Sequence, residues 1–159
     1  MIVEKGRKLV VFRYKPYMNY DFVSAHKECI SKYGNVWILK IGKQISSATM
    51  EYMCDDKRGL ILRSPKSHGG KMYFCQCSAY KFGEPTKEMK YPTYYSEIRN
   101  SEGTLGGSWI QITSIYELNK EAEKALRLDS NDRILSDVLQ ETRTVIMKVY
   151  AEKDILTIE

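Results

Sequence analysis

Short segments rich in β-branched and aromatic residues recur along the chain, and they limit its fold more than any other feature. They cover residues 9–15, 36–41, 60–62, 72–77, 109–115 and 144–150. Some links between them carry helical periodicity, and others, such as residues 64–70, are short enough for a hairpin. This order predicts an α+β fold, a small twisted and mostly antiparallel β-barrel of about six strands with helices packed around it. We expect a single domain over residues 1–159.

Helical patterning fills the longer links between these segments. Asp21 is placed to cap a helix over residues 22–33, and Gly34 supplies its stop. Two amphipathic helices are expected near the end of the chain, the second with Leu135, Val138 and Leu139 on its apolar face. A short helix is predicted to start at Ser46 or Ser47 and to end near Asp55 and Asp56. The two helices near the end of the chain are predicted over residues 119–128 and 131–141, with Asp129 or Ser130 as the cap between them.

The net charge of +5 is unevenly distributed along the chain. Residues 1–90 hold 17 Lys and Arg against 8 Asp and Glu, whereas residues 91–159 hold 8 against 12. A basic half beside an acidic half can give one face a positive potential, which attracts phosphates. The twelve tyrosines favour a binding surface that is partly exposed to water, because each ring is apolar and carries a polar hydroxyl group. Scattered surface lysines and a tyrosine-rich sheet are the plainer alternatives.

Motifs for catalysis or metal binding are incomplete. Gly42-Lys43 resembles the end of a phosphate-binding P-loop but lacks the preceding glycine and the following Ser or Thr. His26 and Cys29 have a spacing that could hold a metal, yet two ligands do not make a zinc site. The neighbouring Asp55 and Asp56 would point in different directions. We therefore expect no catalytic residues, no metal site and no cofactor.

The first residues, the hydropathy and the cysteines of the chain predict its cellular compartment. The first residues lack the long apolar stretch of a secretory signal, and no window approaches the ~18 apolar residues of a membrane span. The four cysteines do not have the spacing of a disulfide framework, which favours reduced thiols. A cytoplasmic protein without membrane contact is expected.

Aromatic and cationic residues near strand ends form the predicted binding site. Rings can stack on an unpaired base, and lysine and arginine can hold phosphates. The candidate base-binding residues are Trp37, Trp109, Tyr94, Tyr95, Tyr73 and Ser64, and the candidate phosphate-binding residues are Lys40, Lys43, Arg63, Lys66 and Lys71. Both tryptophans could instead be core residues.

The order of these segments resembles the PUA-like superfamily, in particular its EVE, YTH and ASCH-type branches. The resemblance rests on the opening strand and helix at 9–33, the hairpin at 59–77, and the closing stretch from Trp109 to QETRTV at 140–145. It implies a small barrel that grips RNA, or a flipped DNA base that is often modified, in an aromatic-lined pocket. It also implies a restriction or defence setting, with a motor or nuclease domain or subunit as a further partner.

The sequence therefore predicts a non-catalytic domain that binds DNA or RNA and recognises a modified or flipped-out base. One alternative is a small nucleic-acid-processing enzyme, either a nuclease or an ASCH-type hydrolase. A second alternative is a protein-interaction module of a defence or toxin–antitoxin complex that uses the acidic C-terminal helices.

Overall fold

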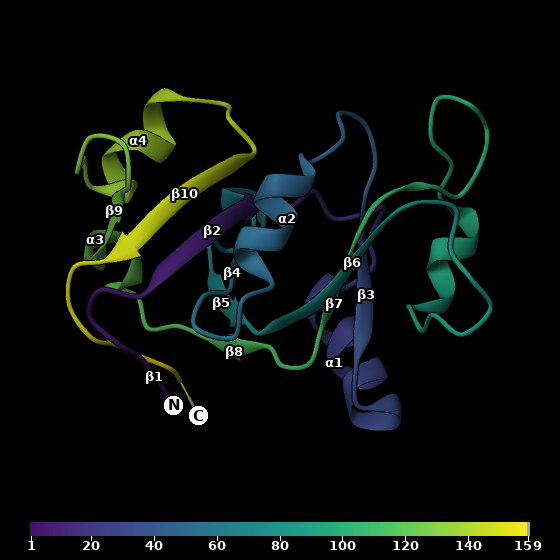
Figure 1. Ribbon diagram of the computed structural model, residues 1–159, viewed down its shortest axis with the longest axis horizontal. Coiled ribbons are helices and arrows are strands. Elements are labelled where there is room, and N and C mark those ends of the chain that lie inside the picture. Colours follow the sequence, from purple (N-terminus) through teal and green to yellow (C-terminus); the bar gives the residue numbers. More distant parts are fainter. Residues whose placement is uncertain (159) are drawn as a thin grey trace. The chain divides into compact units, whose positions relative to one another are not determined.

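The computed structural model describes residues 1–158 and shows an α+β chain (Figure 1). These residues form eleven β-strands and four α-helices, with two short 3-10 helices. The chain divides into two compact units, each assembled from separated segments. Unit 1 comprises Met1–Lys15, Lys57–Cys75 and the chain from Tyr116 onward, and unit 2 comprises Pro16–Asp56 and Gln76–Ile115.

Unit 1 is built on a six-stranded sheet with the order β8-β5-β4-β2-β10-β9. Within it, β2 and β4 run parallel, and every other neighbouring pair is antiparallel. A separate two-stranded sheet pairs β1 with β11. The strand bounds are β1 Ile2–Val3, β2 Lys8–Arg13, β4 Leu60–Arg63, β5 Met72–Cys75, β8 Tyr116–Glu117, β9 Leu126–Leu128, β10 Ile146–Ala151 and β11 Ile155–Leu156.

The core of unit 1 is an apolar layer between this sheet and two short helices, α3 (Ala122–Ala125) and α4 (Leu135–Glu141). Figure 1 shows both helices beside β9, which they contact. The predicted apolar face of α4 is confirmed, since Leu135, Val138 and Leu139 are all buried. A 3-10 helix, η1 (Lys66–His68), lies in the loop between β4 and β5. This packing fixes α4 against the sheet.

Unit 2 holds a three-stranded antiparallel sheet in the order β3-β7-β6. Helix α1 contacts β3, and α2 contacts β6. The long link between β6 and β7 contains the 3-10 helix η2 and several tyrosines. The bounds are α1 Phe22–Tyr33, β3 Val36–Lys40, α2 Ser47–Met53, β6 Cys77–Gly83, η2 Thr93–Glu97 and β7 Gly107–Ile112.

Several sequence predictions of local structure are confirmed. The Asp21 carboxylate accepts a hydrogen bond of 3.0 Å from the backbone N–H of Ser24, which caps α1. Gly34 ends that helix with φ at +83°, a conformation that glycine adopts without strain. Ser46 caps α2 in the same way as Asp21 caps α1. The four cysteines are free thiols.

The predicted helix over residues 119–128 is wrong in most of its length. Only Ala122–Ala125 is helical, and Leu126–Leu128 pairs with β10 as an edge strand. Strand pairing with β10 is favoured over a longer helix, because it buries Leu126 completely and satisfies backbone hydrogen bonds. The cap predicted at Asp129 or Ser130 is also wrong, since α4 begins after Ile134 and has no side-chain cap.

The sheets differ from the predicted barrel. Residues 1–158 form more strands than the six expected, because short pairs such as β1 with β11 leave little sequence signal. Their sheets are open, and no closed barrel is found among them. The α+β class and the mostly antiparallel pairing are confirmed. None of the helices in this part of the chain has the length and apolar character needed to cross a membrane.

Candidate functional site

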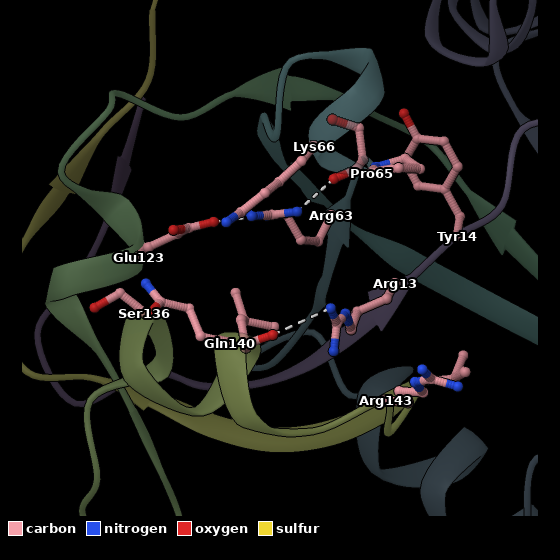
Figure 2. Close-up of a pocket in the computed structure, with 12 residues that line it drawn as sticks. Arg13, Tyr14, Arg63, Pro65, Lys66, Glu123, Ser136, Gln140 and Arg143 are labelled. Atoms are coloured by element: carbon pink, nitrogen blue, oxygen red, sulfur yellow. Dashed lines mark hydrogen bonds and ion pairs between the residues drawn. The ribbon is translucent and has the colours of Figure 1, made fainter.

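A cleft of about 630 Å³ opens in unit 1 where the ends of β2 and β4 face α4 (Figure 2). Its walls come from three separated segments of the chain: the end of β2, the β4–η1 connection, and α3 with α4 and the link into β10. Four cationic side chains line it, those of Arg13, Arg63, Lys66 and Arg143. Glu123 is the only carboxylate among its lining residues.

The parallel pairing of β2 with β4 sets two of these cations side by side. Arg13 and Arg63 are register partners at the last position of each strand. Partners in a parallel pair project to the same face of the sheet, so both guanidinium groups reach the same end of unit 1. This juxtaposition follows from a parallel strand pair whose members are about fifty residues apart in the chain.

The Arg13 side chain caps the C-terminal end of α4. Its guanidinium donates to the backbone carbonyls of Thr142 at 2.6 Å and Leu139 at 3.3 Å. A cation is favourable there, because the last carbonyls of a helix lack intrahelical partners and carry partial negative charge. These partners are neutral groups, so Arg13 keeps its formal positive charge in the cleft.

Arg63 is the most buried cation of the cleft, with 8% of its side chain exposed. Its Nε donates to Glu123 Oε1 at 2.6 Å, and its Nη1 donates to the Ser64 carbonyl at 2.6 Å. A buried charge needs such a partner, since an unpaired one would be strongly destabilising. Arg63 and Glu123 therefore neutralise each other; Figure 2 marks the bond between them with a dashed line.

Lys66 and Arg143 are the two exposed cations of the cleft. Lys66 begins η1, and Arg143 follows α4 in the link to β10. Among residues 1–158, neither side chain has a hydrogen-bond or ion-pair partner. Together with Arg13 they leave three positive charges that no carboxylate in the cleft cancels.

The neutral lining supplies shape and hydrogen-bonding groups. Ser64 is held rigidly, because its hydroxyl accepts from the Lys71 N–H at 2.8 Å and its own N–H donates to the Lys71 carbonyl. Ser136 and Gln140 face the cleft from α4, and Tyr14 adds an aromatic ring. Such a set can hold an anion with several oxygens, since arginine presents paired donors to phosphate or carboxylate.

The structure brings three of the predicted site residues into this cleft: Arg63, Lys66 and Ser64. Lys71 lies in the same unit but lines a different hollow, with its ammonium 3.6 Å from Glu117. Tyr73 also belongs to unit 1 and is buried.

Lys40 and Lys43 lie in unit 2, outside the cleft. The Lys40 ammonium donates to the Lys43 carbonyl at 2.5 Å. Burial lowers the pKa of Lys40, and the nearby Lys43 lowers it further.

Four of the five predicted ring residues, all except Tyr73, gather in unit 2 and lie largely inside it. Trp109 is fully buried and its indole N–H donates to the Gly83 carbonyl at 2.8 Å, so no ring face is available for stacking. Tyr94 and Tyr95 are buried beside it, and Trp37 packs against the cluster while partly exposed. The rings and most of the cations expected to share one cleft thus belong to different compact units.

Sequence reasoning missed Arg13, Glu123 and Arg143 as site residues. Arg143 stands in the QETRTV stretch that carried the family resemblance, so a signal for it was present. The pairing that aligns Arg13 with Arg63 has no local signature, because both residues look like ordinary strand ends. Glu123 falls inside the amphipathic helix predicted over residues 119–128, and nothing in that pattern marks it as a partner of Arg63.

Comparison of the chain with protein-family models, with curated proteins and with solved structures finds no match. The PUA-like resemblance therefore stays a prediction. Within the described part of the chain, no group of three or more His, Cys, Asp or Glu side chains is arranged to hold a metal ion.

Proposed function

We propose that this chain is a non-catalytic nucleic-acid-binding protein whose phosphate contacts are made in the cleft of unit 1. The observation that carries the proposal is the convergence of four cations on one cleft that contains a single carboxylate. That carboxylate is already paired with Arg63, which leaves Arg13, Lys66 and Arg143 to attract an anion. Phosphate contacts of this kind supply most of the affinity in nucleic-acid binding.

The size and lining of the cleft agree with a nucleotide unit as the ligand. Its volume of about 630 Å³ falls within the usual ~300–1,000 Å³ of ligand sites. Arginine fits two phosphate oxygens at once, whereas Lys66 acts as a mobile point charge. The polar groups of Ser136 and Gln140 can bond the sugar or the base edge. We further propose that the bound strand, DNA or RNA, carries the modified or flipped-out base that the protein recognises.

Binding of fluorescent single-stranded DNA and RNA oligonucleotides at low and high salt tests this function. We expect the wild type to bind at low salt and to weaken steeply as salt rises, because bound phosphates release counterions. The double variant Lys66→Ser/Arg143→Ser should bind at least about tenfold more weakly at low salt. Glu123→Gln removes the only carboxylate of the cleft lining but also the charged partner of the buried Arg63, so its folding is checked first by circular dichroism. The folded variant should bind more tightly.

A charge-matched control separates a specific cleft from general basicity. Lys87 and Lys153 are exposed and do not line the cleft, so Lys87→Ser/Lys153→Ser should retain wild-type affinity. Absence of wild-type binding at low salt would overturn the proposal. Cleavage of the labelled oligonucleotide in the presence of Mg²⁺ or Mn²⁺ would contradict its non-catalytic part.

A further inference from the structure

An aromatic hollow of about 280 Å³ lies on unit 2, and its lining includes four tyrosine rings, one lysine and one carboxylate, that of Glu28. The rings are Tyr20, Tyr33, Tyr91 and Tyr94, and the lysine is Lys32. Tyr20 and Tyr33 were not among the residues predicted from the sequence to bind a base. The volume suits one planar ring system, because it lies near the lower end of ligand pockets, at about 300 Å³.

One wall of the hollow is a stack of parallel tyrosines. Tyr20 lies on Tyr94 with centroids 4.4 Å apart and planes 8° apart, and Tyr17 is parallel to both. The Tyr20 hydroxyl donates to the Glu97 carboxylate at 2.9 Å, which fixes the ring at its outer end. Tyr20 nevertheless remains 40% exposed, so this rigid wall offers apolar surface to a ligand.

The other wall combines an exposed ring with positive charge. Tyr33 ends α1 and is 44% exposed. The ammonium groups of Lys32 and Lys90 lie 5.3 Å and 5.1 Å from its ring centroid. Lys32 lines the hollow and Lys90 lies beside it over the Tyr33 ring, and together they outnumber the lining carboxylate of Glu28. The resulting net positive charge favours a flat ring that carries an attached anion. A nucleobase with its phosphate has both properties.

We propose that this hollow is a base-stacking site, in which Tyr20 and Tyr33 hold one base of a bound strand while Lys32 and Lys90 contact its phosphate. The inference rests on the nucleic-acid binding proposed above and names where a base is held. Stacking on an aromatic face tolerates any base, because every base has a π-face. The site therefore adds affinity without strong sequence preference.

The test compares an oligothymidylate with an abasic strand of the same length, at low salt. The wild type should bind the base-bearing strand about tenfold more tightly, which is the usual scale for one stacked base. Tyr20→Leu and Tyr33→Leu should each reduce this preference severalfold, and the double variant should abolish it. Tyr33→Phe should retain it, because the ring is kept.

Tyr116→Leu is the matched control, since Tyr116 is similarly exposed at 42% but belongs to unit 1. This variant should leave the preference unchanged. Equal wild-type affinity for the two strands, or a preference that survives the double variant, would overturn the base-stacking site alone. Absence of wild-type binding to both strands would instead overturn the nucleic-acid function itself, so the two failures are distinguishable.

Discussion

His26 is fully buried in unit 2 and uses both of its ring nitrogens. Nδ1 lies 2.6 Å from the Phe22 carbonyl, which can only accept, so Nδ1 carries the proton. Nε2 therefore accepts from the Tyr95 hydroxyl, 2.5 Å away. The Tyr95 oxygen in turn accepts from the Leu39 N–H at 3.4 Å. This chain of bonds ties α1, η2 and β3 together and requires a neutral imidazole.

Burial lowers the pKa of His26 to about 4 and raises the pKa of Tyr95. The unfolded histidine takes up a proton below about pH 6.5, whereas the folded one resists until about pH 4. Stability is therefore lost as the pH falls from about 6.5 towards 4, by about 2 kcal/mol between pH 7 and pH 5. Urea unfolding at these two pH values measures the loss.

The variant His26→Gln should lose most of this pH dependence, because glutamine does not titrate. His68→Gln, at an exposed position in η1, should keep the wild-type dependence. An identical pH profile for His26→Gln and the wild type would show that another group is responsible.

At the scale of single elements, the two ends of α1 and the start of α2 were predicted correctly, whereas the extent of the helix over residues 119–128 was not. Asp21, Gly34 and Ser46 mark helix ends through short-range hydrogen bonds and backbone conformation, which depend only on neighbouring residues. Residues 126–128 also have a helical pattern, but their conformation is decided by β10, which follows them by about twenty residues. Non-local pairing of this kind has no local signature.

Removing the N-terminal cap of α1 tests how much the Asp21 side chain contributes to stability. Asp21→Ala should lower the free energy of unfolding by about 1 kcal/mol, because the Ser24 N–H loses its acceptor. Asp21→Asn should be nearly neutral, since asparagine caps about as well. Thermal or urea unfolding of the three proteins measures the differences. Equal stability of Asp21→Ala and the wild type would contradict the capping role.

At the scale of the whole molecule, the charge asymmetry indicated more residues of the candidate cleft than the aromatic residues did. The basic first half of the chain supplies three of the four cleft cations, Arg13, Arg63 and Lys66. Most of the predicted rings instead gather in the other unit, and the chain passes repeatedly between the two. Cys75 and Cys77, two residues apart, already belong to different sheets. Closeness in the sequence therefore could not show which rings and cations share a site.

The salt dependence of oligonucleotide binding is the most direct test of phosphate binding in the cleft of unit 1. The logarithm of the association constant falls linearly with the logarithm of salt, and each lost phosphate contact reduces the slope by about one. We expect a slope smaller by up to about two for Lys66→Ser/Arg143→Ser, and a wild-type slope for Lys87→Ser/Lys153→Ser. Equal slopes for the two double variants would contradict a phosphate-binding role of the cleft.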